Sequence, residues 1–236
     1  MQAQPLVPRW AAMTEPSFPA AVAPLTTDER VRAIDGVAAS HRRLIGELAR
    51  LTDDQARSPS VLDGWSVGHV LTHIARNADS FRGIADGVLA GEERDQYPGG
   101  AAQRTGDIET GAVRPAAELV ADVREAAERL EATWAQLSDE QWASGTGRTA
   151  AWGAIPISYV VLARWREVEI LRTDLGLGAT WHDLDPAYLR AEVPRALAIL
   201  AGLAGADDGA DPALARVLVA TLFGRREGPV DVPAVL

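Results

Sequence analysis

The chain has 236 residues, a formal net charge of −10 and no cysteine. An acidic chain without a basic stripe lacks the phosphate-contacting surface of nucleic-acid-binding proteins, and the absence of cysteine excludes disulfides and thiolate metal ligands. No run approaches the roughly 18 apolar residues that span a bilayer, so we expect a cytoplasmic protein that binds neither nucleic acid nor a membrane.

The beginning of the chain differs from the rest in composition. Residues 1–24 contain several prolines and no continuous apolar stretch of the kind that a signal peptide needs. We expect them to form an extended or disordered tail, in which Met13 is one candidate for the natural start. Residues 25–180 are expected to form one helical domain, and residues 181–236 a small C-terminal subdomain.

Four long segments repeat apolar residues every three to four positions, which is the spacing of one buried helix face. Thr27 and Ser66 are expected to cap the first two helices, and a proline stands near the first position of the third and of the fourth. Four such helices indicate a bundle, and the fold class is therefore mainly α. The segments are approximately 27–51, 66–90, 115–137 and 156–176.

The connections and the C-terminal part carry weaker signals. Residues 91–114 show little periodicity and predict a long loop, a common cover for a functional site. Residues 138–142 predict a short capped turn, and the stretch that follows, up to about residue 155, predicts a loop or a short extended piece. Near the end, about 186–204 and 212–223 predict two further helices.

Two polar residues stand next to the apolar stripes of the second and fourth segments. His69 and His73 are four residues apart and share one side of the second helix. His73 is either a hydrogen-bonded core histidine or a metal ligand. Glu167 lies among apolar residues of the fourth helix, where a carboxylate is costly unless it is paired, protonated or metal-bound. Pairing with neighbouring arginines on a solvated face is the alternative.

Three stretches of the sequence carry a family resemblance. They are similar to the mycothiol-dependent maleylpyruvate isomerases, which belong to the DinB-like superfamily of metal-binding four-helix bundles. The resemblance covers about residues 27–178 and returns weakly at Arg225. It implies a zinc ion between the second and fourth helices, the low-molecular-weight thiol mycothiol as cofactor, and a small unsaturated keto acid as substrate. The stretches are DGWSVGHVLTHIARNA, RWREVEILRTDLG and LFGRREG.

The resemblance also implies a set of metal ligands, and this chain departs from it. Two ligands fall on His73 and Glu167. The third is a histidine one helical turn later, where this chain has Leu171. Two protein ligands make a weak zinc site, because a catalytic zinc usually has three. His69 and Asp174 are candidates to fill the gap, and a vacant or water-filled pocket beside a leucine wall is the other expectation.

The anion-binding arginines of the family fall on Arg104 and on Arg225, with the adjacent Arg226 as an alternative. A planar guanidinium can hold a carboxylate through two parallel hydrogen bonds. The resemblance therefore implies that Arg104 and Arg225 are catalytic residues that hold the substrate, together with the two metal-ligand candidates. Asn77 and Arg226 are expected to contact the cofactor.

A second departure concerns the C-terminal subdomain. Isomerases of the family carry a C-terminal α/β domain with recognisable strands. The residues after 183 in this chain predict helices and show few strand patterns. We therefore expect a DinB-like four-helix bundle with a short, mostly helical C-terminal appendage, in which the α/β domain of the family is reduced.

Three functions follow from these observations. The first is a mycothiol-dependent isomerisation, or a thiol transfer, on a small unsaturated acid. The second is a repurposed metal-independent enzyme that catalyses an isomerisation, cyclisation or addition in small-molecule biosynthesis, with His73 or Glu167 as general acid or base. The third is a non-catalytic protein that binds a small molecule. Each needs only a small-molecule partner, and we expect a monomer or a weak homodimer.

Overall fold

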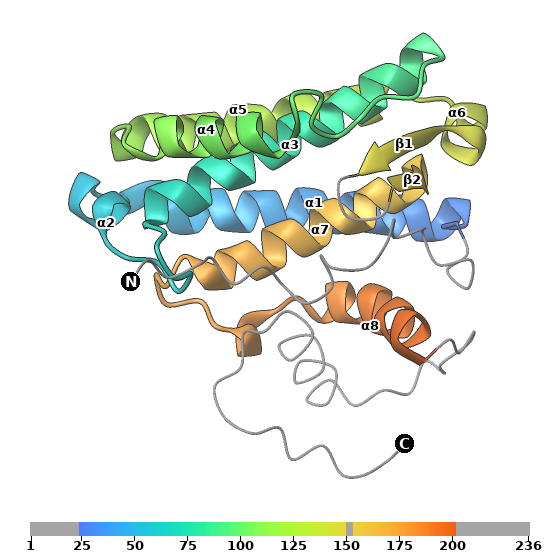
Figure 1. Cartoon of the computed structure of the whole chain (residues 1–236). Coiled ribbons are helices and arrows are strands. Elements are labelled where there is room, and N and C mark those ends of the chain that lie inside the picture. The colour runs from blue at the N-terminus through green and yellow to red at the C-terminus, as the bar shows by residue number, and fades with distance from the viewer. Residues whose placement is uncertain (1–23, 150–152, 202–236) are drawn as a thin grey trace.

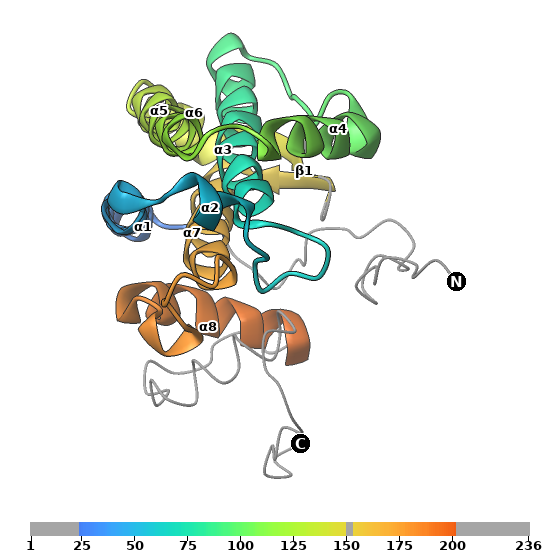
Figure 2. The same cartoon turned by 90° about the vertical axis from the view of Figure 1, so that its left-hand side faces the viewer.

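Four long helices form a bundle that positions the rest of the molecule (Figure 1). The computed structural model describes residues 24–149 and 153–201. Each of the four helices packs against two of the others, so that α1, α5, α3 and α7 form a closed ring, which Figure 2 shows nearly end-on. The mainly α bundle predicted from the sequence is confirmed. The four helices are α1 (Thr27–Glu47), α3 (Val67–Ala90), α5 (Ala116–Trp134) and α7 (Ile157–Asp174).

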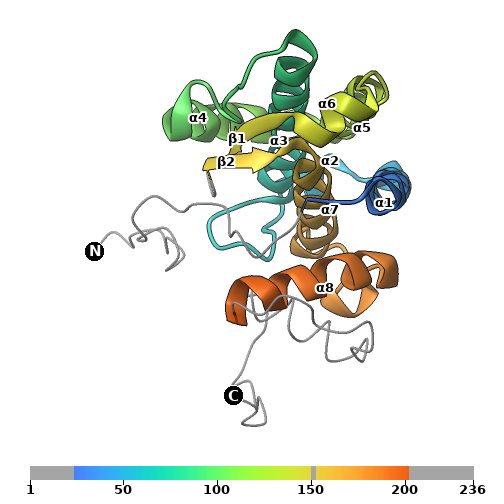
Figure 3. The ribbon, with the colours of Figure 1, turned by 90° about the vertical axis from the view of Figure 1, so that its right-hand side faces the viewer.

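Shorter elements cover the bundle on two sides. α4 (Gly100–Ala112) packs against α3, and α8 (Pro186–Ala201) packs against α7 and α1, as Figure 3 shows from the other side. β1 (Thr146–Thr149) and β2 (Gly153–Pro156) form an antiparallel hairpin, which matches the extended piece predicted there. The remaining short helices are η2 (Leu48–Arg50), α2 (Asp53–Arg57), α6 (Asp139–Ser144) and η3 (Trp181–Asp183).

The starts of the helices follow from local side-chain chemistry. Ser66 caps α3 as predicted, because its hydroxyl accepts from the backbone N–H of His69 while the His69 ring accepts from the backbone N–H of Ser66. The cap of α1 is Thr26 and not Thr27. Both threonines are suitable caps, but only Thr26 has a glutamate three residues later, and Glu29 completes the capping box.

The segment 91–114 is not the long loop that the sequence predicts. Most of it forms α4, whose buried residues are Ile108 and Ala112. Two buried positions are too few to give a periodic pattern, which is why the helix was missed. α4 approaches α3 closely at Gly68, where a Cβ atom would lie 2.2 Å from the carbonyl oxygen of Ala112. Glycine at that position therefore allows α4 to lie against α3.

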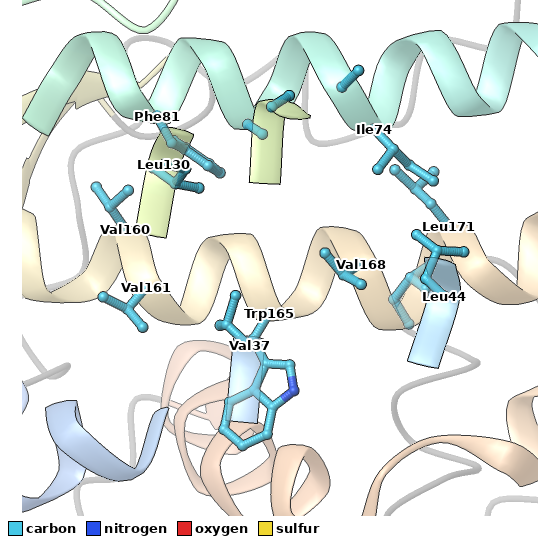
Figure 4. Close-up of a cluster of buried hydrophobic side chains, with 14 of the residues drawn as sticks. Val37, Leu44, Ile74, Phe81, Leu130, Val160, Val161, Trp165, Val168 and Leu171 are labelled. Atoms are coloured by element: carbon cyan, nitrogen blue, oxygen red, sulfur yellow. The ribbon is translucent and has the colours of Figure 1, made fainter. Parts of the chain in front are cut away.

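α7 is buried on most of its surface because three elements pack around it, namely α1, α3 and α8. A helix in this position buries more than one stripe, and its buried residues include the charged Arg164, Glu169, Arg172 and Asp174. Its core side chains interlock with those of α3 and α1 in the cluster of Figure 4. Leu171 belongs to this cluster, lies near Ile74 and Leu44, and is 5% exposed.

The C-terminal part is helical as far as the structure describes it. Tyr188, Leu189 and Val193 of α8 are buried against the bundle, and Glu192 forms an ion pair with Arg166 of α7. The helix expected at 212–223 and the tail expected at 1–24 lie outside the described residues, apart from Pro24. Among the described residues, no helix has the length and apolar character needed to cross a membrane.

A polar network crosses the interior of the bundle. Arg164 of α7 is fully buried, and its Nε donates to Nε2 of His41 on α1 over 3.0 Å. Its Nη1 donates to the carbonyl oxygen of Ile74 and to Oδ1 of Asn77, both on α3 and both at 2.9 Å. Nδ1 of His41 lies 2.6 Å from a carboxylate oxygen of Glu131 on α5. These contacts join all four helices.

The network requires a neutral His41. Its Nε2 accepts from Arg164, so the ring proton is on Nδ1 and is donated to Glu131. Burial lowers the pKa of His41 to about 4, against the opposing hydrogen bond of Glu131 and with a further lowering by the charge of Arg164. A proton on Nε2 would remove the acceptor and place a second positive charge beside the guanidinium.

The low pKa of His41 should make the stability of the protein fall as the pH drops. Because the unfolded chain protonates His41 near its ordinary pKa and the folded chain does so only near pH 4, the stability is full above pH 6.5 and falls as the pH drops. Between pH 7 and pH 5 we expect a loss of about 2 kcal/mol in the free energy of unfolding. Urea unfolding measures it, and the loss should be absent in His41→Gln. If the free energy of unfolding of His41→Gln falls with pH as steeply as that of the unchanged protein, the assignment to His41 is wrong.

Candidate active site

The packing of α3 against α7 brings His73 and Glu167 together. Nε2 of His73 lies 3.3 Å from Oε2 of Glu167, and their side chains are 10% and 33% exposed. Both lie beside the apolar core but remain reachable at its edge. The spatial arrangement on which the sequence-based site depends is therefore present, and Glu167 has an imidazole as its partner.

α4 contributes a third side chain to this pair. Nη2 of Arg104 lies 3.2 Å from Nδ1 and 3.3 Å from Nε2 of His73. The guanidinium also lies over the ring of Tyr97, 5.6 Å from its centroid. A guanidinium can only donate hydrogen bonds, so the contact with His73 uses a lone pair of the imidazole. The helix that the sequence did not predict thus carries one of the predicted site residues to the pocket.

An aromatic neighbour limits how His73 is placed. Trp65, just before the cap of α3, meets the His73 ring edge to face at 5.7 Å and stacks on the His69 ring at 6.1 Å. The role of Trp65 as a wall of the site was missed, although its position directly before the cap residue was a signal. His69 itself is engaged by Ser66 and by Glu109, whose carboxylate lies 3.3 Å from Nε2 of His69.

The electrostatic environment keeps Glu167 ionised. Burial alone raises the pKa of a carboxyl group, but the hydrogen bond and charge of His73 and the charges of Arg164 and Arg166 outweigh it. The pKa of Glu167 is therefore below its ordinary value. The site therefore contains a carboxylate that can stabilise positive charge on the neighbouring imidazole.

The arginines of α7 do not form the solvated ion-pair face that was the alternative to a buried site. Arg164 is fully buried and belongs to the network inside the bundle. Arg166 pairs with Glu192 of α8, and Arg172 with Glu47 of α1. Arg172 also lies 3.9 Å from Glu169 on α7 itself, but the shorter contacts are with other elements and are not visible in the spacing along one helix.

The other predicted site residues have different surroundings. Asn77 is buried and holds Arg164 through its side-chain oxygen. It lies one helical turn beyond His73, and its contact with a cofactor stays a prediction. Arg225 and Arg226 lie outside the described residues. The structure thus brings together Arg104, His73 and Glu167 and leaves the C-terminal arginines undescribed.

The donor set does not fit a three-ligand zinc. Leu171 stands one turn after Glu167, and its hydrocarbon side chain cannot donate to a metal. In the part of the chain that the structure describes, no group of three or more His, Asp or Glu side chains is arranged to hold a metal ion. We therefore derive no chemical step through zinc.

Comparison with known proteins decides the family. Residues 37–176 match the family described as the mycothiol maleylpyruvate isomerase N-terminal domain. The chain belongs to this family. The matched region contains α3, α4, α5 and α7, and with them Arg104, His73 and Glu167. The resemblance stated from the sequence motifs is confirmed.

Solved structures agree with the family assignment. A crystal structure of the mycothiol-dependent maleylpyruvate isomerase is 26% identical, with a TM-score of 0.66, and the match covers 73% of this chain and 70% of that one. A histidine-to-alanine mutant of that isomerase gives 25% identity, a TM-score of 0.65 and the same coverage. No curated protein sequence matches the chain. The DinB-like architecture is therefore shared with enzymes.

Proposed function

We propose that the protein catalyses a thiol-dependent isomerisation of a small unsaturated acid, or a thiol transfer to it, with mycothiol as the thiol. The observation that carries the proposal is the convergence of His73, Glu167 and Arg104 at the edge of the core. An imidazole backed by a carboxylate is suited to accept the proton of a thiol, and a guanidinium is suited to hold a carboxylate. The family supports the choice of thiol.

The side chains have separate tasks in this mechanism. The thiol cofactor supplies a nucleophile that adds reversibly to the activated double bond, so that the bond becomes single and can rotate. Arg104 turns from the imidazole to the substrate carboxylate, which frees the lone pair on Nδ1 of His73. Nδ1 accepts the thiol proton, and the carboxylate of Glu167 stabilises the resulting imidazolium through Nε2. His73 returns the proton when the thiol leaves.

One observation favours a second candidate function. Leu171 is a hydrocarbon side chain one helical turn after Glu167, at the position of an implied ligand. A pair without a metal can act as a general acid and base on another small molecule, in an isomerisation, a cyclisation or an addition. The same residues support both candidates, and the dependence on a thiol separates them.

The experiment is an isomerisation assay with maleylpyruvate, the substrate named for the structural relatives, in the presence and absence of mycothiol. Turnover that requires the thiol supports the proposal. Turnover of an acid without a thiol supports the metal-independent alternative. Binding of the acid without any turnover contradicts both and indicates a binding protein.

Arg104→Met should raise the KM for the acid about 10- to 100-fold, because a charge-assisted hydrogen bond to the carboxylate is worth roughly 1.5–3 kcal/mol. Arg104→Lys keeps the charge but loses the planar fork, so its KM should lie between that of Arg104→Met and that of the unchanged protein. Steady-state kinetics measures the change. Arg57→Met is a matched control, since Arg57 is exposed and pairs with Asp54 within α2. Equal KM values for Arg104→Met and the unchanged protein would contradict the role.

A further inference from the structure

The His73–Glu167 pair has the spacing of one edge of a metal site. Two donors of a tetrahedral zinc with bonds of about 2.0–2.1 Å are about 3.3 Å apart. Nε2 of His73 and Oε2 of Glu167 are separated by 3.3 Å. The bundle therefore still presents two donors at the distance that a metal needs, and the question is what occupies the remaining positions.

No imidazole can complete the site. The chain has four histidines, and the three besides His73 are engaged elsewhere. His41 belongs to the network inside the bundle, and His69 caps α3. His182 stacks on Trp181 in η3, with ring centroids 3.7 Å apart. At the position one turn after Glu167, Leu171 packs into the core (Figure 4).

A cation is already present at the pair. Nη2 of Arg104 lies within 3.3 Å of both ring nitrogens of His73. While the guanidinium is at this position, its positive charge repels a divalent cation at a half-buried site, where solvent screens poorly. The carboxylate of Glu167 is balanced without a metal as well, because His73, Arg164 and Arg166 all lower its pKa.

We propose that the guanidinium of Arg104 takes the place of a divalent metal in this pocket, and that the replacement of a single ligand by Leu171 is what prevents zinc binding. The inference rests on the proposed function for the location of the site. Its test measures metal, and therefore fails or succeeds independently of any turnover.

The test compares zinc content by elemental analysis and zinc affinity by competition with a chromophoric chelator. The unchanged protein, purified without chelator, should contain no stoichiometric zinc. Leu171→His should bind zinc about a hundredfold more tightly or better, since one ligand contributes roughly a quarter of the binding free energy of a four-ligand site. The gain should disappear in Leu171→His combined with His73→Ala. Leu171→Phe, a ring without donors, should show no gain.

A further variant tests the guanidinium. Adding Arg104→Met to Leu171→His should increase zinc affinity again, by about tenfold or more, because the competing charge is removed. If circular dichroism shows that Leu171→His does not fold, Leu171→Asp supplies a smaller ligand. The zinc content of the unchanged protein tests the proposal in either case.

Three results would overturn the inference. The first is stoichiometric zinc in the unchanged protein that is lost in His73→Ala. The second is a folded Leu171→His or Leu171→Asp protein without a gain in affinity. The third is no effect of Arg104→Met on that gain. Each result leaves the thiol assay of the proposed function untouched.

Discussion

Replacing Arg164 with alanine should lower the free energy of unfolding by about 3–5 kcal/mol, the range found when a buried charged partner is removed. The substitution leaves Nε2 of His41 and Oδ1 of Asn77 without their donor inside the core. An unsatisfied buried acceptor costs about 1–3 kcal/mol. The cavity left by the long side chain adds to the loss.

The guanidinium is charged in the folded state. Burial lowers the pKa of Arg164 to about 10, with the carboxylate of Glu167 as the largest opposing influence. The group is therefore protonated at neutral pH. Glu167 lies three residues further along α7, and removal of Arg164 also takes away a charge that keeps that carboxylate ionised.

Urea unfolding followed by circular dichroism measures the effect through the transition midpoint, provided that the slope of the transition is unchanged. Arg124→Ala is a matched control, because Arg124 is exposed on α5 and its loss should change the stability by less than about 0.5 kcal/mol. A loss of less than 1 kcal/mol in Arg164→Ala would show that the network is dispensable. Arg164→Lys should recover little, because an ammonium cannot reach all three acceptors.

The hydrogen bonds of Arg164 also determine where His73 and Glu167 lie relative to each other. Arg164 donates to the carbonyl oxygen of Ile74, the residue after His73, and precedes Glu167 by less than one turn. It therefore fixes how α7 is placed against α3 along their axes. A shift of one helical turn between them would separate the imidazole from the carboxylate.

Much of the fold was predictable because its determinants are local. The apolar period gives the four long helices. A serine or threonine with a suitable residue three positions later gives the starts of α1 and α3, and a proline marks the starts of α5 and α7. The capping box at Ser66 is an example, as is the one-residue correction from Thr27 to Thr26, which Glu29 decides. These signals act within one turn and need no tertiary information.

The features that were missed depend on contacts between elements. α4 has two buried residues, and its position depends on the close approach at Gly68. Arg164 lies in a segment rich in charged residues, where spacing alone suggests a solvated face. Only the packing of α1 and α3 against α7 makes that face an interior.

All three site residues were named from the sequence, but the contact of the third with the imidazole was not. His73 and Glu167 were identified from the motifs, and the two helices bring them together. The contact of Arg104 with the imidazole requires α4, so no spacing along the chain predicts it. The effect of Leu171 is visible in the sequence as a missing donor.

His73→Gln should lower kcat for the proposed reaction by about 10²–10⁴, the usual contribution of a positioned general base. Glu167→Gln keeps the shape of the side chain and removes the charge that stabilises the imidazolium, so it should also lower kcat about a hundredfold or more. Steady-state assays with maleylpyruvate and mycothiol measure both. His69→Gln is the matched control on the same helix face, and it should retain most of the activity because Ser66 and Glu109 engage that ring.

The combined variant tests whether the two residues act together. If Glu167 works only through His73, then His73→Gln with Glu167→Gln should lose no more activity than the worse single variant, because residues that act as a unit are not additive. Losses that multiply would indicate that Glu167 contacts the substrate independently and that the assignment of roles is wrong. Unfolding curves for all variants separate a catalytic loss from a loss of fold, since the pair lies at the edge of the core and neither residue donates or accepts within the buried network.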